Sequence, residues 1–458
     1  MTDEVDLIIV GAGPAGMAAA RTMAKNGARV LLLDEQQRPG GQIYRGLDAS
    51  PAGYLGRDYA AGAGLIASME APEITYEGNA RVWRIEDGPR VLWSRDGETH
   101  VSAGRALLLA GGAQERPVPF PGWTLPGVMS AGAAQILMKS AGMLPRGAIL
   151  AGSGPLLYLV ALQLIHAGAP PVALVETQTK AMMARAAWHL PGALRCSPVL
   201  VKGLGLLRRI RAAGVTRFTG ARDFCAEEGE GGDVTFRFTA KGRAQEITAP
   251  LLLTHHGVVP STHMSRAAGV SHRWNETQQA YQPEVDALGR TNVAGVHIAG
   301  DAAGIAGAEA AAFAGELAAL DILRLAGKLS DKVFEARAEP VRVVLKRARA
   351  VRPFLDAAYA PPAEVLAPVG ETIVCRCEEV TAEEIRRSVA EGAQGPRQVK
   401  TATRAGMGPC QGRMCELAVR GIIAECGGTP DLPRTRSPIK PVSLGEMAAL
   451  AQGQPPSD

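Results

Sequence analysis

Four cysteines near the C-terminus have the residue type and spacing best suited to chemistry in this sequence. Cys375 and Cys377 lie in VCRCEEVT, and Cys410 and Cys415 lie in GMGPCQGRMC, with 32 residues between the two pairs. An iron–sulfur cluster needs four thiolates that converge on a small inorganic core. A C-x-C pair can supply two ligands to one iron, and a C-x4-C pair in a Gly-rich turn can supply the other two. The quartet therefore predicts a centre for one-electron chemistry.

Other interpretations of the quartet remain open from the residues alone. Four thiolates also suit a structural zinc ion, although C-x-C spacing is uncommon at zinc sites. Two disulfides are a further alternative, but the chain begins MTDEVDLIIVGAG, without a signal peptide, which indicates a reducing cytoplasm. The scattered Cys196, Cys225 and Cys426 are expected to be buried small hydrophobes rather than ligands.

The residues between the two pairs predict a helix that spaces them. The segment TAEEIRRSVAEGA (381–393) opens with a Thr that can cap a helix, and acidic residues follow in the first turn. We expect a charged helical connector and Pro-rich linker over 331–370 and an iron–sulfur domain over 371–430. The Pro-rich tail, 431–458, is expected to be either disordered or laid across a neighbour.

A second constellation, at the N-terminus, predicts a dinucleotide site. An apolar strand (Leu7–Val10) precedes Gly11, Gly13 and Gly16, which match G-x-G-x-x-G, and a helix and a second strand (Val30–Leu33) follow. The glycines permit a tight turn, close approach of the backbone to a pyrophosphate, and packing of the helix on the strand. The helix N-terminus offers free N–H groups to phosphates. An acid then follows the second strand, where a carboxylate can bind ribose hydroxyls.

Three further Gly-rich segments favour FAD over NAD. They are PGGQIYR (39–45), ALLLAGG (106–112) and the strand-loop-helix segment VHIAGDAAG (296–304), a pattern typical of two-dinucleotide flavoproteins. We expect an FAD-binding domain over 1–122 and 286–330. The candidate FAD-binding residues are Gly11, Ala12, Gly13, Pro14, Ala15, Gly16, Asp34, Glu35, Gly41, Gln42, Ile43, Arg45, Val82, Ala110, Gly111, Gly300 and Asp301.

A second βαβ unit lies inside the first, and we expect a second nucleotide-binding-like domain over 123–285. Gly152 and Gly154 hold two glycine positions, but Leu157 replaces the third, and Glu176 ends the second strand. An occupied NAD(P) or other nucleotide site and a purely structural domain are both open. The segment LLLTHHGVVPS is expected to form a strand pair that closes this domain, with His255 and His256 at a turn between domains rather than at a metal site.

Composition limits the function classes. The net charge of +4 over 458 residues does not indicate nucleic acid or a membrane surface, and apolar stretches of about a dozen residues are too short to span a bilayer. Neither the first Gly-rich loops nor the second domain carries C-x-x-C, so a dithiol mechanism is not expected. No pair of residues that could act as nucleophile and base lies in a recognisable catalytic motif. The sequence therefore indicates a cytoplasmic electron carrier without catalytic residues of its own.

With these residues in view, the chain resembles the FAD- and [2Fe-2S]-binding α (A) subunits of heteromeric amine and imino-acid dehydrogenases. These include opine oxidases, D-hydroxyproline dehydrogenases and cyanide-forming glycine oxidases. The resemblance is most specific in PGGQIYR, AGGAQERPVPFPGWTLPGVMSAGAAQ, HHGVVPST and the cysteine segment CRCEEVTAEEI…TRAGMGPCQGRMC. That last segment is also similar to bacterioferritin-associated ferredoxin, whose last cysteine pair is C-x2-C rather than C-x4-C.

The resemblance implies an α/β fold with two Rossmann-like dinucleotide-binding domains and a small C-terminal ferredoxin-like domain. It implies that Cys375, Cys377, Cys410 and Cys415 ligate [2Fe-2S]. It also implies a partner β subunit of the D-amino-acid-oxidase type, which binds substrate and its own FAD and oxidises a C–N bond. An FMN relay at the interface between subunits and a small third polypeptide are further expectations. The alternatives are a self-contained NAD(P)H-dependent reductase and a non-catalytic redox scaffold.

Overall fold

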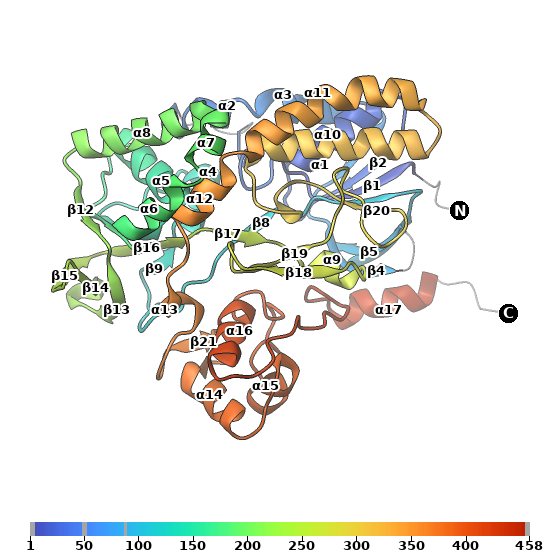
Figure 1. The fold of residues 1–458 in the computed structure, drawn as a ribbon. Helices are drawn as coiled ribbons and strands as arrows, with labels where there is room; N and C mark the ends of the chain where they lie inside the picture. The colour runs from blue at the N-terminus through green and yellow to red at the C-terminus, as the bar shows by residue number, and fades with distance from the viewer. Residues whose placement is uncertain (1–4, 48–52, 87–88, 454–458) are drawn as a thin grey trace.

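A computed structural model describes residues 5–47, 53–86 and 89–453 of the chain. Figure 1 shows two α/β halves side by side, with the small C-terminal region below them. Each half is built on a five-stranded parallel sheet. The chain therefore has the predicted plan of two Rossmann-like units followed by a separate small domain.

The first sheet has the strand order β20-β7-β1-β2-β3. Its strands are almost wholly apolar because both faces are covered. Helices α1 and α10 pack on one face, and the antiparallel meander β4-β5-β6 packs on the other. The bounds are β1 Leu7–Val10, α1 Pro14–Ala24, β2 Val30–Leu33, β3 Ile74–Glu77, β4 Arg81–Glu86, β5 Arg90–Arg95, β6 Glu98–Ala103, β7 Leu107–Leu109, β20 Val296–Ile298 and α10 Ala308–Leu325.

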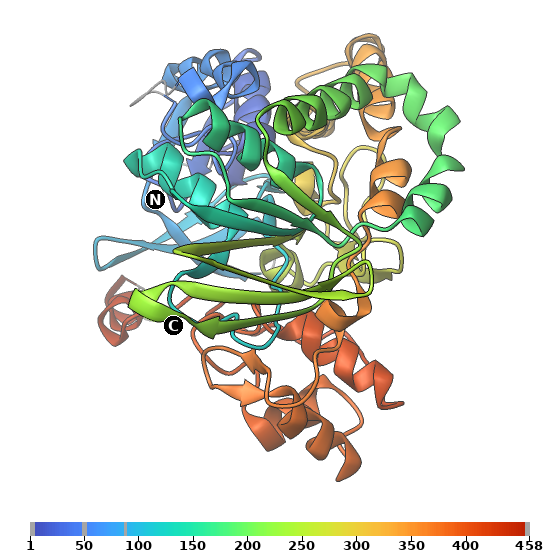
Figure 2. The ribbon, with the colours of Figure 1, turned by 90° about the vertical axis from the view of Figure 1, so that its left-hand side faces the viewer.

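The second sheet repeats this layering with the order β12-β11-β10-β16-β9. Helices α4, α5 and α8 cover one face, and the antiparallel sheet β13-β14-β15 covers the other. Figure 2 faces this half and shows the helices and the antiparallel strands on opposite sides of the parallel sheet. The bounds are β9 Val128–Ser130, α4 Ala131–Ala141, β10 Ala148–Ser153, α5 Pro155–His166, β11 Ala173–Glu176, α8 Ser197–Ala212, β12 Thr216–Thr219, β13 Arg222–Glu228, β14 Val234–Ala240, β15 Arg243–Ala249 and β16 Leu251–His256.

Short elements connect the two halves. The strand pair β8 with β17 lies where the two halves meet, and the strand pair β18 with β19 lies with helix α9 below the first half, toward the C-terminal region. The bounds of these and of the small helices are α2 Arg57–Ala60, α3 Ala63–Ala67, β8 Ala113–Glu115, α6 Lys180–Ala187, α7 Leu190–Ala193, β17 Val258–Pro260, α9 His263–Ala267, β18 His272–Asn275 and β19 Ala280–Pro283.

The predicted connector is helical. Helix α11 (Asp331–Arg349) packs along α10, and α12 (Arg352–Ala358) packs against α6 of the second half. The connector thus crosses from one half to the other before the Pro-rich linker, which contains the short helix α13 (Ala363–Leu366).

The C-terminal region surrounds the four cysteines with short elements. They are β21 Ile373–Cys375, β22 Val380–Thr381, α14 Ala382–Ala390, α15 Pro396–Thr403 and α16 Glu416–Glu425. The predicted helix cap is confirmed, because Thr381 Oγ1 accepts the Glu384 N–H and Glu384 accepts the Thr381 N–H.

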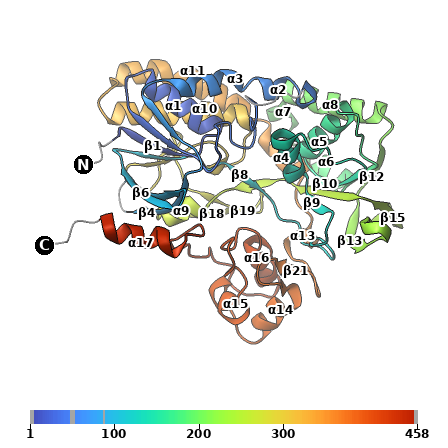
Figure 3. The same ribbon diagram turned by 180° about the vertical axis from the view of Figure 1, so that it is seen from behind.

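The tail continues from this region along the first half of the molecule, which contains the sheet β20-β7-β1-β2-β3. Helix α17 (Leu444–Gly453) lies against the meander β4-β5-β6, as Figures 1 and 3 show. Ile439 is fully buried, and its N–H donates to the Trp83 carbonyl over 2.9 Å. Of the two expectations for the tail, lying across a neighbour is therefore confirmed for 431–453, and residues 454–458 lie outside the described residues.

Candidate functional site

The loop after β1 keeps an open space beside Gly13. A Cβ on Gly13 would meet no described protein atom within 4 Å. The other two glycines are required by packing. A Cβ on Gly11 would lie 2.4 Å from the carbonyl oxygen of Ala110, and one on Gly16 would lie 1.9 Å from the Gly11 oxygen. The free space in front of the α1 N-terminus suits a phosphate, which the unpaired N–H groups of a helix start can bind. The buried residues Ala12, Pro14 and Ala15 complete the loop and first turn.

The two acids after β2 have different partners. Asp34 Oδ2 accepts the Ala12 N–H over 2.5 Å, and Oδ1 accepts the Gln36 N–H over 2.7 Å. Burial raises the pKa of Asp34. Each carboxylate oxygen keeps a further lone pair for a ribose hydroxyl. Glu35 instead forms an ion pair of 2.7 Å with Lys440 of the tail.

The PGGQIYR segment lies against the first Gly-rich loop. The Gly40 N–H donates to the Ala12 carbonyl over 2.9 Å, and a Cβ on Gly41 would lie 2.8 Å from the Cα of Gly13. Gly41 has φ +58, which suits a residue without a side chain. The next candidates, exposed at the end of this loop, are Gln42 and Ile43.

Two cations, Arg45 and Lys139, lie beside these loops. The Nε atom of Arg45 is buried and has no hydrogen-bond partner among the described residues. Lys139 is buried on α4, and its Nζ donates to the Gln42 carbonyl over 2.9 Å. Asp34 is the acid whose charge acts on Arg45. The unpaired guanidinium nitrogen and the buried ammonium fit the negative charge of FAD. Sequence reasoning missed Lys139, because it comes from the second half of the molecule.

We expect FAD affinity to fall as pH rises above about 8. Burial, followed by the charge of Arg45, lowers the pKa of Lys139 to about 8. In the unfolded chain Lys139 should have its ordinary pKa of about 10.4, so it binds a proton at a higher pH than in the folded apoprotein. The free energy of unfolding of the apoprotein therefore decreases as pH falls from about 10.4 to about 8. Bound FAD should stabilise the protonated form of Lys139, so the dissociation constant of FAD should rise roughly tenfold per pH unit over this window. Titration of apoprotein with FAD by fluorescence measures this.

Two variants test the assignment of that pH dependence to Lys139. Lys139→Arg keeps the charge at all these pH values and should flatten the profile, while Lys139→Met should bind FAD weakly throughout. An unaltered slope in Lys139→Arg would contradict the assignment.

The segment around Gly300 and Asp301 returns to the first half and borders the loop after β1. Gly300 has φ +74, and a Cβ there would lie 2.8 Å from the Cβ of Ala15 at the start of α1. Asp301 Oδ1 accepts the N–H groups of Ala306 over 2.8 Å and of Gly307 over 3.0 Å, ahead of α10. The segment therefore meets the first loop, as its pattern predicts.

The remaining candidates lie at the ends of neighbouring strands. Ala110 borders Gly11, and a Cβ on Gly111 would lie 4.0 Å from Met264 Sδ. Val82 is buried in β4, two residues after Ala80, whose N–H donates to the Asp34 carbonyl over 2.9 Å. The structure thus gathers the candidates around one loop, and their contacts with FAD stay predictions.

The four cysteines form two cross-motif pairs, Cys375 with Cys415 and Cys377 with Cys410, and not the expected pairs within C-x-C and within C-x4-C. Cys375 and Cys415 are each 1% exposed, and their side chains are hydrogen-bonded to each other. Cys377 is exposed and lies beside Cys410. The Cys375 Sγ also accepts the Gly406 N–H at 3.4 Å. The bond from the Cys415 thiol, together with backbone N–H groups, lowers the pKa of Cys375 to about 5.

This donor set fits a binuclear cluster. Cys375 with Cys415 and Cys377 with Cys410 supply two neighbouring pairs of thiol groups. A tetrahedral zinc site needs four ligands around a single ion, whereas a [2Fe-2S] cluster takes two cysteines at each iron. When bound, the cluster supplies one-electron redox chemistry, and Cys375, Cys377, Cys410 and Cys415 would hold it.

The prediction for the other three cysteines was wrong about burial. Cys426 is exposed, and Cys196 and Cys225 are only partly buried. Each lies close to a chain turn or sheet edge, where the sequence pattern around one cysteine carries no information about exposure.

The cysteine loop docks on the segment that leaves the FAD loops. Gln114 follows Gly111 by three residues, and its Nε2 donates to the Arg413 carbonyl over 2.9 Å, between the last two cysteines. His263 Nε2 lies 3.0 Å from the Gln411 carbonyl oxygen. Two further contacts are the Arg266–Glu416 ion pair at 2.8 Å and the Arg420 guanidinium 3.4 Å from the Trp274 ring centroid. The two candidate cofactor sites are therefore fixed to one another by direct contacts.

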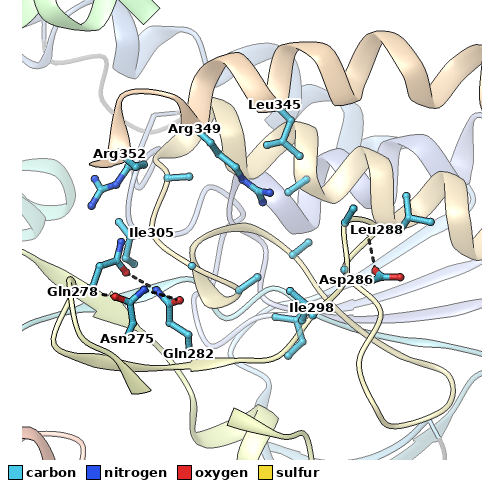
Figure 4. A pocket seen from close by; sticks show the side chains of 18 residues that line it. Asn275, Gln278, Gln282, Asp286, Leu288, Ile298, Ile305, Leu345, Arg349 and Arg352 are labelled. Atoms are coloured by element: carbon cyan, nitrogen blue, oxygen red, sulfur yellow. Dashed lines mark hydrogen bonds between the residues drawn. The ribbon is translucent and has the colours of Figure 1, made fainter. Parts of the chain in front are cut away.

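A cavity of about 420 Å³ opens beside the Asp301 segment (Figure 4). Its walls come from β18 and β19, the end of β20, the loop 303–306 and the end of α11. The polar side chains that line it are Asn275, Gln278, Gln282, Asp286, Arg349 and Arg352. The Arg352 Nε is buried and unpaired among the described residues, although another nitrogen of this guanidinium bonds Asp356. The cavity thus offers positive charge and amide groups to a ligand.

In the second βαβ unit the acid is already paired. Glu176 is fully buried, and its carboxylate accepts a 2.6 Å hydrogen bond from the Tyr158 hydroxyl and two 2.9 Å hydrogen bonds from Arg217. Tyr359, at the end of α12, packs edge-on against Tyr158 at a ring separation of 6.1 Å. A carboxylate held in this way does not face a ribose.

The glycine loop of the second unit is also closed in. A Cβ on Gly154 would lie 3.4 Å from the His255 ring, whereas the space beside Gly13 is open. His255 Nδ1 lies 2.5 Å from Glu115 Oε1. The expected strand pair is present as β16 and β17, but His255 and His256 are buried in β16 itself and not at the turn.

Comparison with known proteins gives the family. Residues 5–315 match the pyridine nucleotide-disulphide oxidoreductase family, and residues 373–425 match the BFD-like [2Fe-2S] binding domain. The chain is 42% identical to the A subunit of opine oxidase from Agrobacterium tumefaciens (strain Ach5), over 98% of this chain and 92% of that protein. The chain belongs to the family of opine oxidase A subunits. With both matched regions present, it is a flavoprotein oxidoreductase subunit with FAD and [2Fe-2S].

Other relatives extend the family. Hydrogen cyanide synthase subunit HcnB of Pseudomonas protegens is 33% identical over 98% of this chain and 97% of that protein. Among solved structures, the L-proline dehydrogenase from P. horikoshii superposes with a TM-score of 0.69 at 20% identity, covering 97% of this chain and 79% of that chain. The latter likeness shows the fold alone. Because the curated relatives are named as subunits, the family occurs in assemblies of more than one kind of chain.

Proposed function

We propose that this chain is the electron-transfer subunit of a heteromeric amine or imino-acid dehydrogenase. It takes electrons from the flavin of a partner chain and passes them through FAD and [2Fe-2S] to an acceptor. The observation that carries this proposal is the short segment shared by the two sites. Gly111 lies at the FAD loops, and Gln114 binds the cysteine loop at Arg413.

The two cofactors suit a converter between two-electron and one-electron chemistry. A flavin accepts electrons as a pair and releases them singly, and an iron–sulfur cluster carries them one at a time. The chain's own residues bind the two groups and hold them in fixed relation through the contacts of Gln114, His263 and Arg266 with the cysteine loop. Such a rigid dock supports transfer within one chain.

The substrate site belongs, on this proposal, to a partner of the D-amino-acid-oxidase type that acts on a CH–NH bond, and a small third polypeptide completes the assembly. The family names of the relatives support this, since they are subunits of an opine oxidase and a hydrogen cyanide synthase. We further infer that an FMN at the interface between subunits occupies the cavity beside Asp301, because Arg349 and Arg352 present guanidinium groups there (Figure 4).

The alternative of a self-contained NAD(P)H-dependent reductase has less support. Glu176 is saturated by Tyr158 and Arg217, and His255 stands beside Gly154. Both features favour a structural second unit rather than a nucleotide site. The scaffold alternative predicts that complexes with altered cysteine ligands keep full turnover.

We expect the isolated chain to be inactive as a complete enzyme. NADH and NADPH should leave its flavin oxidised, and amino acids, imino acids and opines should give no turnover with an artificial acceptor. Absorbance at the flavin band measures the first, and acceptor reduction measures the second. Co-expression with an amino-acid-oxidase-like partner should restore turnover and add FMN to the extracted flavins. Turnover by the single chain would contradict the division between subunits.

A further inference from the structure

Three segments that are far apart in the sequence meet beside the last cysteine pair. The loop after β2 contributes Glu35, the cysteine turn contributes Arg413, and the tail contributes Lys440. Figure 3 shows the tail passing from the cysteine region to the first half. Helices α9 and α16 add one charged side chain each, and both of these charges act on Arg413. We call the charged side chains gathered here the junction, and they are Glu35, Arg266, Arg413, Glu416 and Lys440.

Arg413 is held over the cysteine turn by both ends of its guanidinium group. Its Nη1 donates to the Cys410 carbonyl over 3.3 Å, and its Nη2 donates to the Ile439 carbonyl over 2.8 Å. Ile439 is buried, and its N–H donates to the Trp83 carbonyl of the first half. Because the tail is tied to the first half at this residue, the guanidinium group keeps a fixed place beside the last cysteine pair.

The other two cations of the junction are paired with carboxylates. Arg266 Nη2 donates to both carboxylate oxygens of Glu416, over 2.9 Å and 2.8 Å, and Lys440 forms the 2.7 Å ion pair with Glu35. Arg413 instead donates to two backbone carbonyls, which carry no formal charge. The junction thus combines three cations with two carboxylates, and its net positive charge lies at Arg413.

The charge at Arg413 affects the redox chemistry of the cysteine site. The charge of Cys410 acts on Arg413, and the neighbouring His263 is neutral because burial lowers its pKa to about 3. Reduction adds one negative charge to an iron–sulfur cluster, and the reduction potential depends on net charge and on solvent exposure. A cation fixed in a half-buried site stabilises that added charge more than an exposed cation does. Arg413 should therefore favour the reduced cluster.

We propose that Arg413 raises the reduction potential of the [2Fe-2S] cluster through its fixed positive charge. It ligates no iron, and a purely structural anchor would need its hydrogen bonds but not its charge, so the two roles can be separated. Reduction takes up one electron, from a mediator in the test and from FAD on the proposed function, and no bond in the chain forms or breaks. The inference rests on the proposed function only for the source of that electron.

A redox titration of the full-length holoprotein, with soluble mediators and EPR detection of the reduced cluster, tests the proposal. At a fixed ambient potential, Arg413→Gln should lower the ratio of reduced to oxidised cluster roughly tenfold, which is about 59 mV for a one-electron couple. Arg413→Lys keeps the charge and should stay within about threefold of the wild type. The matched control, Arg397→Gln, removes an exposed charge on α15 and should leave the ratio unchanged. Mediators equilibrate with the cluster directly, so the result does not depend on a partner chain or on transfer from the flavin.

A variant of opposite sign keeps the proposal testable if Arg413→Gln does not load the cluster. Glu35→Gln removes a carboxylate whose charge acts on Arg413, and it should raise the ratio of reduced to oxidised cluster by about threefold. Flavin is quantified in each preparation. An unchanged ratio in Arg413→Gln, or a lower ratio in Glu35→Gln, would overturn the proposal. Equal falls in Arg413→Gln and Arg413→Lys would also overturn it, because they would assign the effect to the hydrogen bonds and not to the charge.

Discussion

Cys377→Ser should remove the visible absorption of the cluster and stop electron transfer to an acceptor, while FAD remains bound. Cys377 lies against Cys410, and a Cβ on Gly408 would come within 2.2 Å of the Cys377 Cβ, so the second loop closes directly on this residue. Losing one thiolate of four leaves an iron with an incomplete soft-ligand set. Absorption and EPR spectra of anaerobically prepared protein, with flavin quantified separately, measure the result.

Cys426→Ser provides the matched control. Cys426 is also exposed, but it ends α16, away from the paired cysteines. Its replacement should leave the spectrum and the iron content unchanged. An unaltered cluster spectrum in Cys377→Ser would refute the ligand set.

Gly13→Val should block FAD loading without unfolding the chain. Gly13 has φ −76 and ψ −174, which valine adopts readily, and a Cβ there meets no described protein atom within 4 Å. The side chain would instead fill the space kept for a phosphate. Loss of two charge-assisted hydrogen bonds at the helix start should weaken FAD binding by roughly a hundredfold or more. Flavin content per chain and the dissociation constant of the apoprotein measure this, with circular dichroism as the check on folding.

Gly64→Val is the control for that substitution. Gly64 also has free space around a Cβ, but it lies in α3, outside the candidate FAD residues. This variant should load FAD normally. Stoichiometric flavin in Gly13→Val would contradict the placement of the pyrophosphate.

Much of the first Rossmann-like unit is predictable from sequence. The strands Leu7–Val10 and Val30–Leu33 have the predicted bounds, because short apolar runs ended by Gly or an acid suit a fully buried parallel sheet. The Thr381 cap is equally local, since the two hydrogen bonds join residues three positions apart. Features that depend only on residues close together in the sequence can be predicted without knowledge of the fold.

Features that depend on contact between distant segments were not predictable. Lys139 reaches the FAD loops from the second half of the chain, and its burial follows from the packing of α4. Glu176 has the position of a ribose-binding acid, but Arg217, 41 residues later, occupies its carboxylate.

The most direct test of the central claim is the arrival of flavin electrons at the cluster within this one chain. The isolated holoprotein is photoreduced through its flavin under anaerobic conditions and frozen at intervals for EPR. The account predicts a reduced [2Fe-2S] signal that grows with flavin reduction in the wild type and is absent in Cys377→Ser. A fully reduced flavin beside a cluster that stays oxidised, with two irons present per chain, would contradict it.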